Sequence, residues 1–517
     1  MSKPPILRHR RDHDRLRWVA MGATGGLGLA LAHAPVAWWP AAPLGIAALA
    51  GIVLRAPGPS QALAGGLAFG VAAWLPVLGW LYTGIEPAHA AWFAYGAPTL
   101  VIAAFAAGPA ACALLAHRLA ARPALTACLL LPALWVGAEW SRQLGSFRFP
   151  WAPLGHTQVD GPLAGLAPIS GVLGVGFFTV ALGGAIALIF LGGRRTRGAA
   201  ALSLVVLLAA AELAARIEWT HPAGAPLRVD LMQGAYAGSA KFDADAVVSA
   251  LQRYSDFALH SRARVSILPE TALPLLEHQL PPGYLAALER RAREENRDIL
   301  LGIFRRAEGE PGRHHNSARI LGASGAQTYD KKILLPFGET IPAAGILRPL
   351  FERIARVPML DAVPGSPQQP APVLGGLRIG LRLCFEDLFG DAGREETAAA
   401  GYLVVLSNDS WDGSALPMHQ HLPAARMRAL EAAKPLLRVA NTGWTAAIGA
   451  DGRIDAIAPP HQPAVLETTL QPRSGVTPYV RHGDAIPLAL ATFASVASLS
   501  ALARGRHERS DQARSPA

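Results

Sequence analysis

The feature that most constrains this chain is a series of long apolar stretches. Each is nearly free of charged residues and, at about 20 residues, long enough to cross the hydrocarbon layer of a membrane as a helix. These stretches cover residues 17–35, 38–54, 60–82, 91–116, 123–139, 167–192, 199–215 and 485–503. With 51% apolar and only 16% charged residues, the chain is also too hydrophobic for an ordinary soluble enzyme. The sequence predicts a polytopic helical membrane bundle of about eight spans.

The long interval between the seventh and eighth stretches has the polarity of a globular protein. It contains most of the acidic residues and is of single-domain size. We therefore expect three units: a bundle of seven spans over 1–219, an inserted globular domain over 220–480, and a last span with a tail over 481–517.

Basic residues alternate between the loops and so predict an orientation. The N-terminal tail "RHRRDHDRLR", the loop near Arg55, "AHRLAARP" and "GGRRTRG" are basic, whereas "HAPVAWWP" and "TGIEPAHA" contain no Lys or Arg. Under the positive-inside rule both termini lie in the cytoplasm and the inserted domain lies outside. This topology also accounts for the net charge of +10 better than a nucleic-acid partner does. Reading the first stretch as a cleaved signal peptide is the competing interpretation, but no clear cleavage site follows it.

Cys384 is the one cysteine of the inserted domain; Cys112 and Cys128 fall in predicted spans. A lone thiol on the oxidising side of a membrane is either a buried apolar group or a nucleophile. Cys384 ends the alternating strand "GLRIGLRLC", whose less apolar face carries Arg382, so we expect a guanidinium near the thiol.

Two other segments contain what a nucleophile needs. "VSILPETALP" is an apolar strand that ends at Glu270, and "YDKKILLPFGETIP" contains paired lysines and Glu339. A carboxylate can take the thiol proton, and an ammonium can stabilise the oxyanion formed when a thiolate attacks a carbonyl.

Glu270 in "PET", Lys331 in "YDKKILLPFGE" and Cys384 in "CFED" occur in an order that resembles the nitrilase superfamily, whose members use a Glu-Lys-Cys triad. "LSNDSWDG" and the Phe-Pro-Trp loop "GSFRFPWAPLGHTQ" add to the likeness. A domain of this kind inserted between a seventh and an eighth span is similar to one branch, the apolipoprotein N-acyltransferases. The likeness extends over nearly the whole chain.

The resemblance implies a role for each matching residue. Glu270 would be the general base, Lys331 the cation that stabilises the oxyanion, and Cys384 the nucleophile that holds an acyl thioester. Lys331 is chosen over Lys332 because it lies eight positions before Glu339. Glu339 and Glu386 match carboxylates that support the site; an acid at a helix start is the alternative for Glu386. The same likeness places Trp151, Asn408 and Trp411 in contact with substrate.

The sequence departs from the family pattern at several positions. Phe385 follows the nucleophile where the family usually has Tyr, and Phe242 stands where a Trp is usual. The Phe385 and Phe242 changes lead us to expect an altered substrate preference beside an intact triad. Arg382 replaces a small apolar residue.

The implied reaction has two steps. The thiolate takes an acyl chain from a phospholipid, and the resulting thioester passes the chain to the α-amine of a diacylglyceryl-cysteine at the N-terminus of an apolipoprotein. No cofactor is implied, and a metal site is not expected at the histidines of "MHQHL" because no acidic or cysteine cluster completes a ligand set in the sequence. A monomer is expected. The apolar segment at 343–365 is either a lid over the site or an ordinary surface helix.

The inserted domain alternates strand and helix patterns, which indicates an α/β fold. Strands are expected at 227–234, 265–270, 298–304, 377–384, 402–408 and 435–441, and helices near 243–261, 284–296 and 421–433. The four-layer αββα sandwich is implied by the resemblance alone. Two rival functions stay open at this point: a membrane-tethered nitrilase-like amidase with the same triad, and a transporter. A transporter predicts charges buried in mid-span, and the candidates Glu139 and Glu212 lie near span ends.

Overall fold

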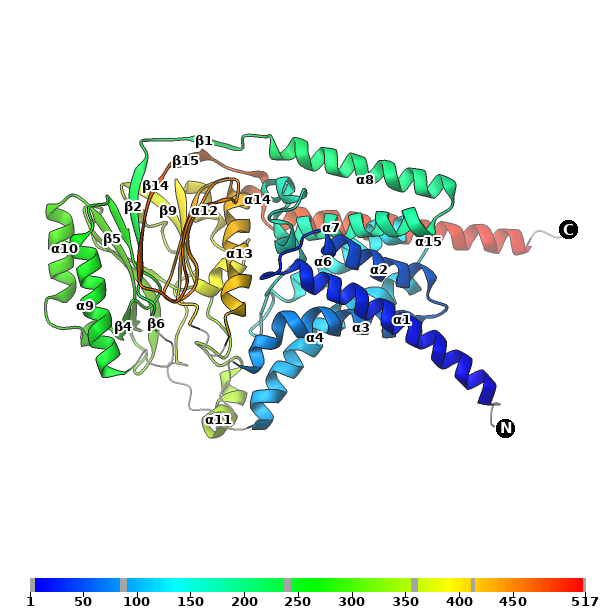
Figure 1. Ribbon diagram of the computed structural model, residues 1–517, viewed down its shortest axis with the longest axis horizontal. Coiled ribbons are helices and arrows are strands. Elements are labelled where there is room, and N and C mark those ends of the chain that lie inside the picture. Colours follow the sequence, from blue (N-terminus) through cyan, green and yellow to red (C-terminus); the bar gives the residue numbers. More distant parts are fainter. Residues whose placement is uncertain (1–4, 84–90, 237–242, 355–360, 411–413, 515–517) are drawn as a thin grey trace.

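A bundle of helices and a two-sheet domain lie side by side along the long axis of the molecule (Figure 1). The computed structural model describes residues 5–83, 91–236, 243–354, 361–410 and 414–514. Both ends of the chain lie at the end of the bundle that faces away from the sheets (Figure 1).

The bundle contains the helical segments expected from the apolar stretches. They are α1 (Pro5–Ala32), α2 (Ala41–Arg55), α3 (Pro59–Leu78), α4 (Ala91–Arg118), α5 (Pro123–Leu125), α6 (Leu131–Ser141), α7 (Ala167–Leu191), α8 (Arg194–Ala215) and α15 (Ala485–Arg514). Within the described residues, six segments are long and apolar enough to span a membrane: 59–82, 94–118, 123–141, 164–191, 194–215 and 485–505. The expected span at 38–54 corresponds to α2, whose 15 residues reach about 22 Å, less than the hydrocarbon thickness of about 30 Å. The count of eight spans therefore stays a prediction.

Small residues allow the bundle helices to pack at close range. A Cβ atom added to Gly22 on α1 would lie 2.0 Å from the carbonyl oxygen of Gly65 on α3. Glycine at such a crossing lets the two backbones touch, which is how helices associate when lipid surrounds them.

The inserted domain is built on two sheets. In the described part of the chain, one sheet has the strand order β14-β2-β3-β5-β6-β7 with β4 beside β5, and the other has the order β13-β12-β11-β10-β9-β8. The first comprises β2 (Leu227–Gln233), β3 (Val265–Ile267), β4 (Leu273–Leu276), β5 (Asp298–Arg306), β6 (His314–Gly322), β7 (Gln327–Asp330) and β14 (Ala464–Leu470). The second comprises β8 (Val373–Leu374), β9 (Leu377–Leu383), β10 (Tyr402–Ser407), β11 (Leu436–Ala440), β12 (Thr445–Ile448) and β13 (Ile454–Ala458). A short pair, β1 (Thr220–Pro222) and β15 (Arg473–Gly475), runs beside them.

The inner faces of the two sheets form one apolar core, and helices cover the outer faces. Residues such as Val229 and Ile267 of one sheet pack with Leu381 and Val404 of the other. Outside the first sheet lie α9 (Ala244–His260) and α10 (Tyr284–Glu294); α12 (Arg394–Ala399) and α13 (Leu416–Ala432) flank the second. The αββα sandwich is thus confirmed, as are the six expected strands and the three expected helices.

The segment that follows Cys384 belongs to the core that the domain shares with the bundle. Phe385, Leu388 and Phe389 pack in one apolar cluster with Trp80 and Trp151 from the bundle side. On α13, Met427 and Leu430 pack against α7. The short helix α14 (Pro478–His482) then leads into α15. The division at 219 and 480 stays a prediction, although the last bundle helix before the sheets ends at Ala215 and α15 begins at Ala485.

Candidate active site

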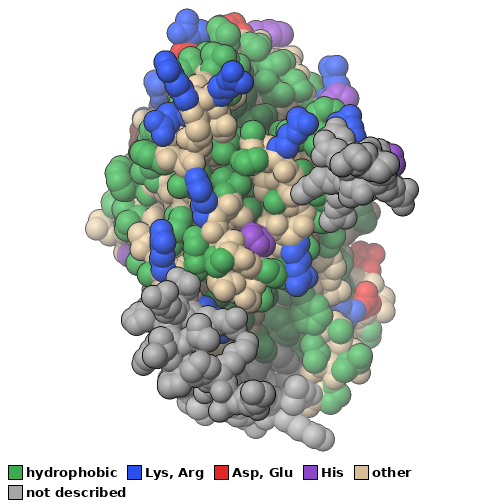
Figure 2. All heavy atoms as spheres, turned by 90° about the vertical axis from the view of Figure 1, so that its right-hand side faces the viewer, with side chains coloured by type: hydrophobic (Ala, Val, Ile, Leu, Met, Phe, Trp, Pro, Cys, Tyr) green, Lys and Arg blue, Asp and Glu red, His purple; other side chains and the backbone are tan. Residues whose placement is uncertain are grey.

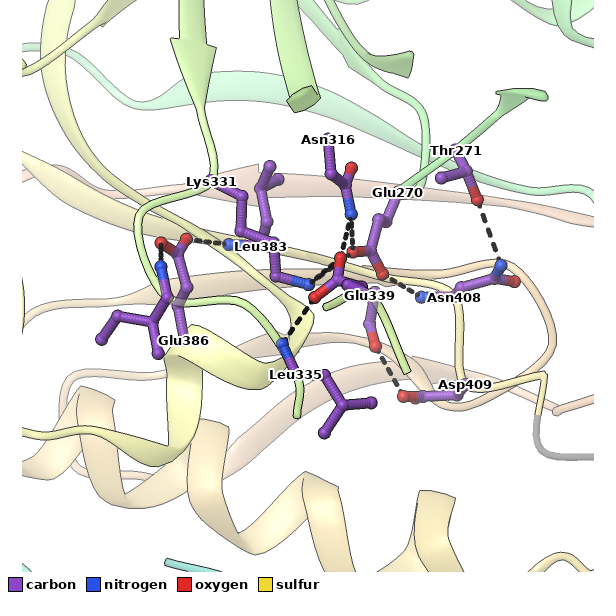
Figure 3. A network of polar contacts seen from close by, with 12 residues as sticks. Glu270, Thr271, Asn316, Lys331, Leu335, Glu339, Leu383, Glu386, Asn408 and Asp409 are labelled. Carbon is purple, nitrogen blue, oxygen red and sulfur yellow. Dashed lines mark hydrogen bonds and ion pairs between the residues drawn. The ribbon is translucent and has the colours of Figure 1, made fainter. Parts of the chain in front are cut away.

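Three residues of the predicted site follow the ends of strands that lead to one edge of the sandwich. Glu270 follows β3, Lys331 follows β7 and Cys384 follows β9. β3 and β5 run parallel, as do β9 and β10, so the turns after β3 and β9 lie where functional groups of α/β domains usually gather. Figure 3 shows Glu270, Lys331 and Glu339 pointing toward one another.

The Lys331 ammonium lies between two carboxylates. Its Nζ is 3.0 Å from Oε1 of Glu270 and 2.9 Å from Oε1 of Glu339, and the side chain is 2% exposed. Burial alone lowers the pKa of Lys331, but the Glu270 and Glu339 charges outweigh it and the pKa lies above its ordinary value. Lys331 therefore stays charged inside the domain. The backbone N–H of Lys331 also donates to the Asn316 carbonyl at 2.8 Å.

Both carboxylate oxygens of Glu270 accept hydrogen bonds. The Asn316 amide donates to its Oε1 at 2.8 Å, and the backbone N–H of Asn408 donates to its Oε2 at 3.1 Å. The Asn408 side chain donates to the hydroxyl of Thr271 at 3.1 Å (Figure 3). Asn408, which the resemblance placed in contact with substrate, thus lies against Glu270.

Cys384 stands in a strained turn at the end of β9. Its φ of +48° lies in the left-handed region, which a non-glycine residue seldom adopts outside functional sites. Burial raises the pKa of the thiol, and the Glu270 carboxylate raises it further, while Lys331 acts in the opposite sense. The resting thiol is therefore protonated.

The expectation that Arg382 supplies the charge near the thiol is wrong. Its guanidinium is buried and donates to the hydroxyl of Thr397 on α12 at 3.4 Å. Alternation does not extend to residue 384 because the chain leaves the strand at Leu383 and turns. The cation that acts on the thiol is Lys331.

The two supporting carboxylates hold backbone as well as side chains. Glu339 accepts from the Asn316 amide at 2.7 Å and, through Oε2, from the backbone N–H of Leu335 at 2.7 Å. Glu386 accepts from the backbone N–H groups of Lys332 and Leu383 at 2.6 and 2.8 Å. Glu386 thereby joins the segment that contains Lys331 to the end of β9, just before Cys384. It lies at the start of a 3₁₀ turn over 384–388, so the helix-start position and the supporting contacts coexist.

An aromatic stack joins the turn at Cys384 to the bundle. Phe385 stacks on Phe149 at 6.2 Å between ring centroids, and Phe149 stacks on Trp151 at 5.6 Å. The Trp151 indole N–H donates to Oε1 of Gln420 on α13 at 2.6 Å. Trp151 is 3% exposed and packs in the same apolar cluster as Phe385. Phe242 and Trp411 lie outside the described residues, as does part of the segment at 343–365, of which 344–354 form α11.

A second polar group beside the thiol was missed by the sequence analysis. Asp409 and His421 lie next to Cys384, and the ligand-type atoms of the three residues are within 4.8 Å of one another. The Asp409 carboxylate also pairs with the buried guanidinium of Arg438. Burial raises the pKa of Asp409, but Arg438 and His421 outweigh that effect and the pKa lies below its ordinary value. A guanidinium inside the set disfavours a divalent cation there. The sequence showed "SND" and "MHQHL" but gave no signal that the two segments meet.

Sequence comparison identifies the family. Residues 25–185 match the N-terminal domain of apolipoprotein N-acyltransferases, and residues 228–479 match the carbon-nitrogen hydrolase family. The apolipoprotein N-acyltransferase of Methylococcus capsulatus is 35% identical over 91% of this chain and 93% of its own length. The chain belongs to the apolipoprotein N-acyltransferase family. The proteins of that name from Azotobacter vinelandii and Ralstonia nicotianae are 37% and 34% identical, over 90% and 94% of this chain and 93% and 94% of their own lengths.

The apolipoprotein N-acyltransferase family combines both parts of the chain. The part of the chain that matches the N-terminal domain of the family forms the bundle. The part that matches the hydrolase-type domain forms the sandwich that contains Cys384. Membership therefore supports an acyltransferase over a membrane-tethered amidase, which would share the sandwich alone.

Proposed function

We propose that this protein transfers a fatty acyl chain from a phospholipid to the α-amine of a diacylglyceryl-cysteine at the N-terminus of an apolipoprotein. The contact that carries the proposal is the buried Lys331 ammonium, held between Glu270 and Glu339 beside the Cys384 thiol. The family relationship supports the choice of acyl transfer.

In the first half-reaction Cys384 is the nucleophile and Glu270 the general base. Because the resting thiol is protonated, Glu270 takes its proton as sulfur attacks the ester carbonyl of the phospholipid. Lys331 stabilises the oxyanion that forms, and the proton passes to the departing glycerol oxygen. The products are a lysophospholipid and an acyl thioester on Cys384.

In the second half-reaction the amine of the apolipoprotein attacks the thioester and forms an amide. Glu339 keeps Lys331 in place, and Glu386 positions the turn that contains Cys384. Asn408 orients Glu270 through its backbone N–H, and Trp151 supports the turn through the aromatic stack. Phe385 fills apolar space in that stack. This packing does not need the hydroxyl of the tyrosine that is usual in the family. On the resemblance alone we assign Trp411 to substrate contact and Phe242 to a supporting position.

We also propose that the protein acts as a monomer. We further propose that the sandwich lies on the periplasmic side of the inner membrane, with both termini in the cytoplasm. Support comes from the position of both chain ends at the end of the bundle away from the sandwich (Figure 1). Figure 2 views that end and shows Lys and Arg side chains spread among hydrophobic ones, with acidic groups only near the edge of the view. This distribution is what the positive-inside rule requires of a cytoplasmic face.

Mass spectrometry of the detergent-extracted protein tests the proposal. Incubation with a phospholipid should add a hydroxylamine-labile fatty-acyl mass to Cys384, and Cys384→Ser should not acquire a hydroxylamine-labile adduct. A diacylated lipopeptide should then discharge the adduct far faster than water does. No adduct on the wild-type protein would refute the thioester, and discharge by water as fast as by the lipopeptide would indicate a hydrolase.

A further inference from the structure

His421 lies beside the thiol, and one of its ring nitrogens has no hydrogen-bond partner among the described residues. The residue is on α13, is 2% exposed, and belongs to the group of three in which His421, Asp409 and Cys384 have ligand-type atoms within 4.8 Å of one another. Its Nδ1 is 3.1 Å from Oδ1 of Asp409. Its Nε2 is buried and has no hydrogen-bond partner within the described ranges.

The contacts at Nδ1 fix the tautomer of the ring. Nδ1 faces both Asp409 and, at 3.2 Å, the guanidinium of Arg438. The Asp409 carboxylate is ionised and can only accept, so its contact with Nδ1 at 3.1 Å needs a hydrogen on that nitrogen. The proton therefore sits on Nδ1 and points to Asp409. This leaves the lone pair on Nε2, so that an oriented imidazole base stands next to the reacting sulfur.

The proton balance of the proposed reaction leaves one step without a base. In the first half-reaction the thiol proton travels through Glu270 to the glycerol oxygen, and no net proton is released. In the second, an α-amine arrives as an ammonium at neutral pH, because its ordinary pKa is about 8. Its nitrogen must lose two protons as the C–N bond forms and the C–S bond breaks. One returns through Glu270 to the Cys384 sulfur, and the other needs a different acceptor.

We propose that His421 is a second general base, specific to the amine half-reaction, which takes the first proton from the acceptor ammonium at Nε2 and passes it to water. Asp409 orients the ring and balances the charge that forms on it. This assignment rests on the proposed function above. The other groups that face the ring are the Cys384 thiol, the Arg438 guanidinium, the Trp151 ring at 5.9 Å between centroids and, at longer range from the bundle side, His156.

Separate measurement of the two half-reactions in His421→Gln tests this role. The variant should acquire the acyl adduct from phospholipid at the wild-type rate. Its discharge by a diacylated lipopeptide should be slower than wild type by about tenfold at pH 7, because only the free-amine fraction then reacts. The difference should vanish near pH 9. Hydroxylamine, which is uncharged at neutral pH, should discharge both proteins equally.

Two further variants separate a base from a structural residue. His419→Gln changes a half-buried histidine on the same helix whose ring packs against Trp444, and it should leave both half-reactions unchanged. His421→Asn should reproduce the pH-dependent defect of His421→Gln. An equal loss in both half-reactions of both His421 variants, a defect that does not change with pH, or no defect at all would overturn the assignment. Failure of the proposed function is a different result, in which the wild-type protein forms no adduct.

Discussion

Lys331 is charged at a place where burial alone disfavours charge, and two carboxylates hold it in that state. Lys331→Met should slow the acylation of Cys384 by at least 100-fold, because the oxyanion loses its cation. It should also lower the free energy of unfolding by about 3–5 kcal/mol, because Glu270 and Glu339 are left buried and unpaired. Adduct formation followed by mass spectrometry, together with thermal unfolding in detergent, measures both effects.

Lys332 is the matched control at the next position. Its ammonium pairs with Glu396 on α12, away from Glu270, and its contact with Glu386 uses only the backbone N–H. Lys332→Met should therefore keep acylation within about twofold of wild type and change the free energy of unfolding by about 1 kcal/mol or less. If Lys332→Met abolishes acylation while Lys331→Met retains it, the assignment of the oxyanion cation is wrong.

At single residues, the sequence predicted the groups that short motifs mark and missed those that folding alone brings together. Glu270, Lys331 and Glu339 sit in contiguous motifs, and the structure places Lys331 in contact with both carboxylates. His421 and Asp409 come from different elements, and nothing in "MHQHL" indicates a thiol nearby. Arg382 was misplaced because alternation assumes that an extended strand continues, whereas Cys384 adopts a positive φ.

At the scale of elements, the loop that contains Trp151 supports the nucleophile turn from the bundle side. Trp151→Ala removes a ring that stacks on Phe149 and should lower the free energy of unfolding by about 3–5 kcal/mol. Acylation of Cys384 should fall as well, because Phe385 loses the far end of its stack. Trp151→Phe keeps a ring but loses the hydrogen bond to Gln420 and should lie between alanine and wild type. Unfolding midpoints that are equal for alanine and wild type would contradict this role.

The contact of α13 with the kinked helix α7 should make stability depend on pH. Burial raises the pKa of Glu431 from 4.5 to about 7, although the paired Arg428 opposes the shift. The native state then binds more protons than the unfolded state between these two values. Stability should fall as the pH rises from about 4.5 to about 7, by about 3 kcal/mol from this group.

Glu431→Gln provides the comparison for that pH dependence. The neutral side chain still accepts from the backbone N–H of Val172, where α7 kinks at Gly171, but it no longer titrates. The difference between the unfolding midpoints of the variant and the wild type should grow from pH 5 to pH 7. A difference that stays constant over this range would show that Glu431 does not titrate there.

Elements with strong apolar patterns were predicted well, and those without such patterns were not. β2, β5, β9, β10 and β11 are apolar runs, and their positions follow from the sequence. β6 and β14 were missed, since His, Asn, Arg or Glu side chains interrupt their apolar residues. Layering of the two sheets is a tertiary property that periodicity does not encode, and it came from the family resemblance.

At the scale of the whole molecule, the number of spans depends on the short helix α2 and on α1. α2 packs on α1 and α7 inside the bundle, and buried residues such as Ile46 and Leu49 join it to the main apolar cluster. An interior helix can be shorter than the hydrocarbon layer when its neighbours exclude lipid from its ends. Two cytoplasmic termini imply that the chain crosses the membrane an even number of times. α1 and α2 must therefore either both cross or both stay on one side.

Labelling of introduced cysteines with a membrane-impermeant maleimide tests this topology. In a Cys384→Ser background the two remaining cysteines, Cys112 and Cys128, lie in the bundle helices and give the reference signal. Glu308→Cys, exposed on the sandwich, should label in bacterial cells whose outer membrane is opened and whose inner membrane is intact. Arg195→Cys, exposed at the start of α8, should label only after the inner membrane is made permeable. The reverse pattern would place the sandwich in the cytoplasm. Labelling of both sites from outside would show that α8 does not cross the membrane.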